Sequence, residues 1–201
     1  MNILAFDTCL DKMYVVLKKD DEILASEIIE NRGEKYHSAF LISTIKTVLK
    51  NNNLKPQNLD LIATNIGPGS FTGIRACTTV ARIMGQQLGC KVIGVSSLEI
   101  LSRCVKNNPL VALDARKNSA YLYADNEIKG AVTLDDVLSL AKSGKYEVIC
   151  DNKLKPILGG ISYQENKFQL GEILADLAVK KELTGDWREL KPLYIQPPPM
   201  G

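Results

Sequence analysis

The sequence predicts an α/β protein built from two successive lobes, of which the second is the shorter. Apolar stretches of strand length alternate with longer stretches of helical periodicity, and this succession starts again after the turn-forming residues Asn107-Asn108-Pro109. Each lobe opens with an apolar strand that ends at an aspartate, Asp7 in the first and Asp114 in the second. We therefore expect one lobe over residues 1–106 and another over 107–201, which includes a proline-rich tail.

Three strands open the first lobe, and helices and strands follow in alternation. The first strand is almost continuously apolar, which indicates burial on both faces, and Lys19-Asp20-Asp21 predicts a hairpin between the next two. The expected elements are strands over 3–8, 13–18 and 22–30, a helix over about 38–51, a strand over 59–65, a helix over about 71–88, a strand over 91–95 and a helix over about 96–105. Three antiparallel strands that lead into parallel crossovers are the ribonuclease H-like arrangement.

The second lobe repeats this order in shortened form. We expect strands over 110–113, 120–124 and 146–150, a helix led by Thr133 and Asp135, a last helix from about Ile173 to Leu183, and a tail, Gln196 to Pro199, that trails along the surface. The predicted fold is thus a duplicated ribonuclease H-like α/β fold with a shortened second lobe, as in the superfamily of actin, sugar kinases and Hsp70.

Composition and charge exclude several classes of function. A chain of 201 residues with 45% hydrophobic residues and a net charge of +2 has no large basic field for binding nucleic acid by itself. The five cysteines form no CxxC pair, so we expect reduced thiols rather than disulfides or a zinc site, and the single histidine, His37, excludes a two-histidine metal site. These residues lead us to expect no bound metal. Met1 leads directly into a strand and no apolar stretch could span a bilayer, so we also expect a cytoplasmic protein without a signal peptide or a membrane contact.

A glycine-rich loop lies between the strand over 59–65 and the next helix. Its glycines permit close backbone approach, its proline restricts one dihedral, and Ser70 or Thr72 can cap the helix that follows. Such a loop could hold an anion at the helix N-terminus, or it could be a rigid turn that aims the helix, and the glycines alone favour the turn slightly. The residues expected to position the helix are Gly67, Pro68, Gly69, Ser70, Gly73 and Arg75.

The helix after this loop has an unusually wide apolar face. One stripe contains Ile74, Cys77, Ala81, Met84 and Leu88, and a second strip beside it contains Ala76, Val80 and Ile83. One part of this face can pack on the sheet, and the rest needs another cover. That cover is either the preceding helix, whose inward residues we take to be Leu41, Ile42, Ile45, Val48 and Leu49, or a second subunit.

Proteins of the predicted superfamily clamp ATP between their lobes, with glycines beside the strand-end aspartates to hold phosphate. Here neither Asp7-Thr8-Cys9 nor Asp114-Ala115-Arg116 contains a glycine, so the backbone cannot readily approach a phosphate. We therefore treat Asp7, Thr8 and Asp114 as a vestigial nucleotide site and expect no catalytic residue and no cofactor. A Ser-His-Asp triad would have to use His37, and no nucleophile-elbow motif accompanies it.

Four segments of the chain resemble the TsaB family, also called YeaZ. They are FDTCLDKMYVVL at the start, HSAFLISTIKTVL, NIGPGSFTGIRACTTVARIMGQQLG and LDARKNSAYLYA. The resemblance implies a non-catalytic paralogue of TsaD, which itself transfers the threonylcarbamoyl group to adenosine in tRNA. It also implies that the ATPase TsaE joins the assembly, that the isolated chain forms a homodimer, and that tRNA is contacted only through the complex. The family's former glycoprotease label is not supported by the motifs present.

The resemblance further implies that the two long helices make the interface, with TsaD or with a second copy. The interface residues expected on them are Leu41, Ile45, Val48, Ile74, Cys77, Ala81, Met84 and Leu88. Cys9-Leu10 departs from the small polar residues of many relatives, which makes nucleotide binding beside Asp7 less secure. Two hypotheses therefore stand: a scaffold that activates a paralogous enzyme, and a weak ATP-binding or kinase-like enzyme.

Overall fold

The computed structural model describes residues 1–30, 37–181 and 185–195 and divides the chain into two compact units. The first unit contains Met1–Ser97 together with Gln169–Pro192, and the second contains Leu98–Phe168 and the residues from Leu193 onward. The expected proline-rich tail from Gln196 and the expected end of the last helix at Leu183 lie outside the described residues.

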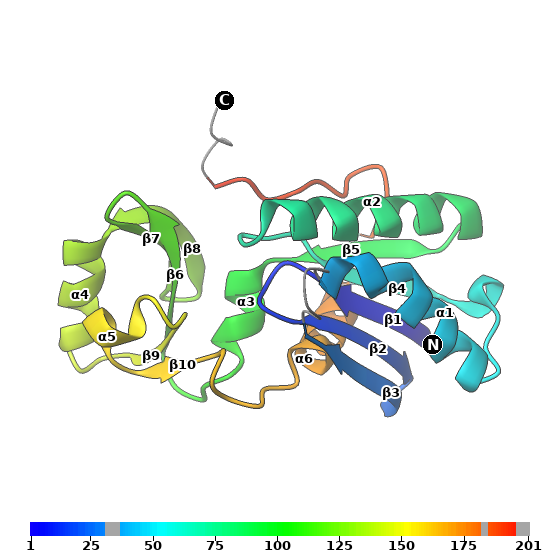
Figure 1. Cartoon of the computed structure of the whole chain (residues 1–201), viewed down its shortest axis with the longest axis horizontal. Helices are drawn as coiled ribbons and strands as arrows, with labels where there is room; N and C mark the ends of the chain where they lie inside the picture. The colour runs from blue at the N-terminus through cyan, green and yellow to red at the C-terminus, as the bar shows by residue number, and fades with distance from the viewer. Residues whose placement is uncertain (31–36, 182–184, 196–201) are drawn as a thin grey trace. The chain divides into compact units, whose positions relative to one another are not determined.

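The first unit is built on a five-stranded mixed sheet (Figure 1). Its strands are β1 (Asn2–Asp7), β2 (Met13–Lys19), β3 (Glu22–Ile29), β4 (Leu61–Asn65) and β5 (Lys91–Val95), in the order β3-β2-β1-β4-β5. The pairs β1–β2 and β2–β3 are antiparallel, whereas β1–β4 and β4–β5 are parallel. This confirms the predicted arrangement of three antiparallel strands that lead into parallel crossovers.

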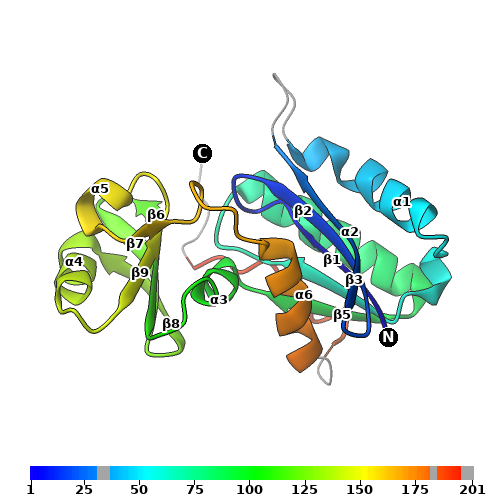
Figure 2. The same cartoon turned by 90° about the horizontal axis from the view of Figure 1, so that it is seen from below.

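Helices cover both faces of this sheet. A short 3-10 turn (His37–Phe40) leads into α1 (Leu41–Asn51), which shares one face with α2 (Phe71–Leu88), and α6 (Leu170–Lys180) lies on the opposite face (Figure 2). Because side chains alternate along a strand, Leu4 and Phe6 pack in the core below α1 and α2. The interior of β1 is fully buried, as predicted for a strand covered on both faces.

The position of α6 corrects the expected domain boundary. We placed this helix in the second lobe, but it packs on β1 and β2 of the first unit. A Cβ added to Gly171 would lie 2.7 Å from Val16 Cγ2, so the backbone of α6 approaches β2 closely. The first sheet needs this apolar helix because its second face would otherwise expose a fully apolar strand to water.

The second unit repeats the topology of the first sheet. Its strands are β6 (Pro109–Arg116), β7 (Ser119–Ala124), β8 (Glu127–Thr133), β9 (Glu147–Cys150) and β10 (Ile161–Ser162), in the order β10-β9-β6-β7-β8. The antiparallel pairs are β6–β7 and β7–β8, and the parallel pairs are β6–β9 and β9–β10. The duplicated fold is therefore confirmed, with β6 in the place of β1.

Two strands of this unit were not predicted. The edge strand β8 is mixed in composition and largely exposed, and β10 contains only two residues, so neither produces a continuous apolar pattern. Three short helices complete the unit: α3 (Ser97–Ser102), which begins where the first unit ends, α4 (Leu134–Lys142) and α5 (Lys155–Leu158). The first unit also has a 3-10 turn at Pro56–Asn58.

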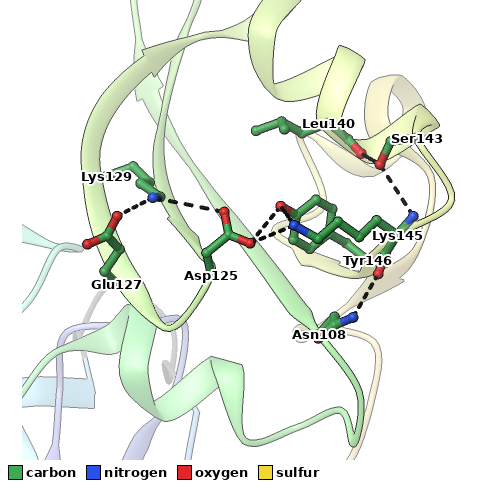
Figure 3. A network of polar contacts seen from close by, with 8 residues as sticks. All are labelled: Asn108, Asp125, Glu127, Lys129, Leu140, Ser143, Lys145 and Tyr146. Atoms are coloured by element: carbon green, nitrogen blue, oxygen red, sulfur yellow. Dashed lines mark hydrogen bonds and ion pairs between the residues drawn. The ribbon is translucent and has the colours of Figure 1, made fainter.

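A polar network joins the β7–β8 turn to the start of β9 (Figure 3). One oxygen of Asp125 accepts hydrogen bonds of 2.9 Å from Lys145 Nζ and from Tyr146 Oη, and Lys129 bridges Asp125 and Glu127. The hydrogen bonds from Lys145 and Tyr146 lower the pKa of Asp125. The groups are solvated and all belong to one edge of the second unit, so the network stabilises a turn and suggests no ligand site.

Candidate functional site

The glycine-rich loop fixes where α2 begins. Asn65, at the end of β4, accepts hydrogen bonds at Oδ1 from Gly67 N at 2.8 Å and from Ser97 Oγ at 3.0 Å. Ser97 N in turn donates to Gly67 O at 2.9 Å. Ser70 then caps the helix, because its hydroxyl accepts a hydrogen bond from Gly73 N at 3.3 Å. The loop is thus held at both ends by hydrogen bonds.

Two of the glycines are required by backbone packing. A Cβ on Gly69 would lie 2.3 Å from Cys9 O, and a Cβ on Gly73 would lie 1.8 Å from Thr8 O. Ser70 N also donates to Cys9 O at 2.7 Å, and Thr8 Oγ1 donates to Gly73 O at 2.8 Å. The first turn of α2 therefore lies directly against the loop that follows β1, which explains these glycines by packing and favours the rigid turn over the anion site.

The residues of the expected vestigial nucleotide site are engaged within their own units. Asp7 is only 1% exposed, and its carboxylate accepts hydrogen bonds from Cys9 N at 2.6 Å and from Asn65 Nδ2 at 3.0 Å. Asp114 belongs to the second unit, where it accepts from Arg116 N and from Lys153 Nζ, both at 2.9 Å. Burial opposes ionisation of Asp114, yet these two hydrogen bonds lower its pKa below the usual value.

The expected interface residues point into the core of the first unit. Six of them have exposed fractions between 0 and 4%: Leu41, Ile45, Val48, Ile74, Cys77 and Ala81. Met84 and Leu88 are half-buried against the same core. A side chain with almost no exposed surface has nothing left to bury against a partner, so this stripe holds α1 and α2 on their own sheet. The burial therefore argues against six of the eight residues as partner contacts, whereas Met84 and Leu88 stay predictions.

The second apolar strip of α2 lies on the outer face of the helix. Ile83 is 56% exposed, and Ala76 and Val80 beside it are half-buried. On α1, Ile42 is also 56% exposed, although we expected it to point inward. On an ideal helix Ile42 lies about 100° from Leu41 and about 60° from Ile45, at the margin of the buried face, so the apolar pattern alone did not decide whether it is buried. We call the apolar residues Ile42, Phe71, Ala76, Val80 and Ile83, of which Ala76 and Val80 are half-buried and the others exposed, the outer patch.

Basic side chains flank the outer patch. The sequences of α1 and α2 contain Lys46, Lys50, Arg75 and Arg82 but no aspartate or glutamate. These four side chains are exposed, and the Arg75 guanidinium lies over the Phe71 ring with its carbon 3.8 Å from the ring centroid. The exposed side of α1 and α2 therefore combines apolar side chains with four basic groups and has no acidic group. Nothing in the hydrophobic pattern pointed to this charge, but the absence of acidic residues from both helices did.

No helix in residues 1–30, 37–181 and 185–195 is long and apolar enough to cross a membrane. The chain has clear relatives among known proteins. A family model described as tRNA N6-adenosine threonylcarbamoyltransferase matches residues 22–145. The tRNA threonylcarbamoyladenosine biosynthesis protein TsaB of Buchnera aphidicola subsp. Baizongia pistaciae is 32% identical over 96% of this chain and 97% of that protein.

Other curated relatives match over part of their length. The TsaB protein of Bacillus subtilis is also 32% identical, over 60% of this chain and 53% of that protein. The TsaB protein of Buchnera aphidicola subsp. Schizaphis graminum is 32% identical over 59% of this chain and 58% of that protein. This chain therefore matches between half and three fifths of the length of these two relatives.

Two solved structures share the fold of this chain. An uncharacterized protein with similarity to peptidase YeaZ, from Pseudomonas aeruginosa, superposes with a TM-score of 0.77 at 19% identity and covers 97% of this chain and 99% of that chain. YeaZ from Pseudomonas aeruginosa superposes with a TM-score of 0.75 at 18% identity, over 96% of this chain and 99% of that chain. At these identities the likeness establishes the fold alone.

Proposed function

The chain belongs to the TsaB (YeaZ) family, and we propose that it is a non-catalytic subunit that binds and activates a TsaD-type transferase during threonylcarbamoylation of adenosine in tRNA. The observation that carries this proposal is the outer patch, a set of apolar side chains on the outer side of α1 and α2, the two helices that cover one face of the first sheet. The names of the relatives supply the pathway, and the geometry supplies the surface through which the chain would act.

The outer patch has the features of a docking surface. It combines exposed apolar side chains with basic ones and has no acidic residue, as in interfaces where apolar contacts are joined by polar and charged groups. Both helices are held rigidly from behind by the buried stripe, so a partner would meet a preformed surface and little ordering would oppose binding. The rim charge favours a TsaD face with acidic residues around an apolar centre.

The geometry around Asp7 supports a non-catalytic role. In related ATP-binding folds the strand-end aspartate and its neighbours face the nucleotide, whereas here Asp7 accepts hydrogen bonds from Cys9 N and Asn65 Nδ2. The first turn of α2 also packs against the Thr8 and Cys9 carbonyl groups, where a phosphate would need room. Phosphoryl transfer depends on positioned phosphate and metal, and this packing leaves the loop little freedom to provide them.

The remaining partners follow from the same proposal. TsaE, an ATPase, would join through the assembled complex, and tRNA would be contacted by the complex rather than by this chain alone. In isolation the chain would form a homodimer through the outer patch. Homodimer and TsaD complex would then compete for one surface, so added TsaD would dissociate the homodimer by mass action.

The decisive experiment compares two exposed isoleucines. Ile83 lies in the outer patch, and Ile157, 47% exposed in the second unit, serves as a matched control outside it. We expect Ile83→Glu to weaken binding of the organism's TsaD homologue by about 2 kcal/mol, or roughly 30-fold, because a charge must be desolvated at the apolar centre. Calorimetry measures the affinity, and a tRNA modification assay with and without each variant measures the consequence.

The results separate the two functional hypotheses. Loss of binding and of modification with Ile83→Glu, and neither with Ile157→Glu, supports the scaffold. Equal effects of the two substitutions would place the TsaD contact elsewhere. If the unmodified chain instead binds ATP with magnesium at submicromolar affinity and turns it over without TsaD, the weak ATP-binding or kinase-like alternative is correct.

A further inference from the structure

Three potential metal ligands meet beneath the glycine-rich loop. Asp7 ends β1, Cys9 follows two residues later, and Cys77 lies on the second turn of α2. One ligand atom from each residue lies within 4.8 Å of the others, and the three residues are between 0 and 2% exposed. In the part of the chain that the structure describes, no other group of three histidine, cysteine or acidic residues is brought together in this way. We call these residues the Asp-Cys-Cys cluster.

The spacing of the cluster suits a small thiophilic cation. Zinc binds cysteine sulfur at about 2.3 Å and carboxylate oxygen at about 2.0–2.2 Å, so tetrahedral ligand atoms lie about 3.5–3.8 Å apart. The ligand atoms of the cluster lie within 4.8 Å of one another, a limit that is compatible with these separations. The Cys9 thiol donates a hydrogen bond to the Asn65 carbonyl oxygen at 3.3 Å, and this oxygen is the candidate fourth ligand.

Hydrogen bonds already orient the proposed ligands. Thr8 N donates to Cys77 Sγ at 3.1 Å, a contact that stabilises negative charge on the sulfur. Asn65 Nδ2 donates to Asp7 Oδ2 at 3.0 Å and to Ser97 Oγ at 2.9 Å, so the carboxylate is held from outside the cluster. Such supporting hydrogen bonds are typical of metal sites, where they fix the ligands and tune their basicity.

A disulfide between the two cysteines is the competing interpretation. Thiol oxidation proceeds through an accessible thiolate, but Cys9 and Cys77 are buried. Three groups that become anionic on deprotonation lie together in the core, and a divalent cation would offset this charge, whereas a disulfide would leave Asp7 unchanged.

We propose that Asp7, Cys9 and Cys77 form a closed structural site for a thiophilic divalent cation, for which zinc is the best match. Bound there, the ion joins the end of β1 to α2, the helix that carries most of the outer patch. The site is independent of the proposed function, since it requires neither TsaD nor tRNA.

Cobalt and zinc titrations of the full, untagged chain test the proposal under reducing, oxygen-free conditions. Cobalt bound to cysteine sulfur produces a sulfur-to-metal charge-transfer absorption in the near ultraviolet, which we expect to saturate at about one ion per chain and to disappear when zinc is added. Zinc should also raise the unfolding temperature, because the ion binds the folded chain. A wild-type chain that gives neither the absorption nor the temperature shift overturns the proposal, whatever the variants do.

The substitutions Cys9→Ser and Cys77→Ser test the ligands, and Cys90→Ser is the control. Cys90 is a half-buried cysteine that adjoins the first unit's core but lies outside the cluster. Each ligand substitution should abolish the charge-transfer band or reduce zinc affinity at least about 10-fold, and the control should change neither. Circular dichroism establishes that each variant is folded. Binding retained by both ligand variants, or a Cys9–Cys77 disulfide found by mass spectrometry in the unreduced wild type, contradicts the assignment.

Discussion

The inner and outer faces of α2 both carry apolar residues in the sequence, but these residues have opposite surroundings in the structure. Ile74, Cys77 and Ala81 are buried against the first sheet. Ile83, on the outer side of the helix, is 56% exposed. The apolar residues of the two faces have different roles. The inner face stabilises the fold, and we assign the outer face to a partner, so substitutions on the two faces should fail in different ways.

Ala81→Glu and Ile83→Glu should separate these failures most clearly. Ala81 is fully buried, so a glutamate there must be desolvated in the core, and we expect a loss of about 3–5 kcal/mol in the free energy of unfolding. Ile83→Glu should change that free energy by only about 0.5 kcal/mol. Urea unfolding measures both. Equal destabilisation would show that the two faces are not distinct.

Gly73→Ala should produce the next largest effect. The added methyl group would overlap the Thr8 carbonyl oxygen, so we expect a loss of about 1–3 kcal/mol in the free energy of unfolding. Thr72→Ala, at the neighbouring exposed position, is the control and should change it by no more than about 0.5 kcal/mol. A Gly73→Ala variant as stable as the control would show that the loop can move away from α2.

Salt should affect the two proposed complexes of the outer patch in opposite directions. The basic residues beside the patch would repel each other in a homodimer and attract an acidic TsaD face. Raising salt from about 50 to 500 mM should therefore increase the affinity of the homodimer and decrease that of the TsaD complex, each by a few-fold. Sedimentation velocity measures the homodimer, and calorimetry measures the TsaD complex. The same direction of change in both would argue against a shared basic rim.

The smallest effect is expected at Asp114, the counterpart of Asp7 in the second sheet. Its pKa is lowered in the folded chain, so the stability it contributes is present above the ordinary carboxyl pKa of about 3.9 and is lost as pH falls through the lowered value. Lys153→Ala removes a solvent-screened ion pair and should cost no more than about 0.5 kcal/mol at neutral pH. The difference in the free energy of unfolding between variant and wild type, measured by urea unfolding, should shrink below about pH 4. A difference that does not change with pH would mean that Lys153 acts through packing.

Local patterns in the sequence were sufficient for most of the architecture. The continuous apolar strand β1, the hairpin between β2 and β3, and the wide apolar helix α2 all follow from hydrophobic period and turn residues. The strand–aspartate repeat was also sufficient to predict the duplication. The structure confirms it, since the equivalent strands β1 and β6 occupy the centres of their sheets. The largely exposed edge strand β8 escaped because charged, small and apolar residues are mixed along it, although Val132 packs against the core.

Which apolar residues face inward was decided only by the tertiary structure. The sequence showed two apolar strips on α2, but periodicity does not say which strip meets a sheet and which meets solvent. Burial assigned Cys77 and Ala81 to the core and Ile83 to the surface, and the return of α6 to the first sheet was decided in the same way.

The sequence by itself determined the α/β class, the duplication and the family, since these depend on local periodicity and on motifs read along the chain. It did not bring Asp7 and Cys77 together, because residues 70 positions apart meet only when β1 and α2 pack against each other. The outer patch and the Asp-Cys-Cys cluster both depend on that packing, which arises from side chains distributed over the whole first unit rather than from any one segment.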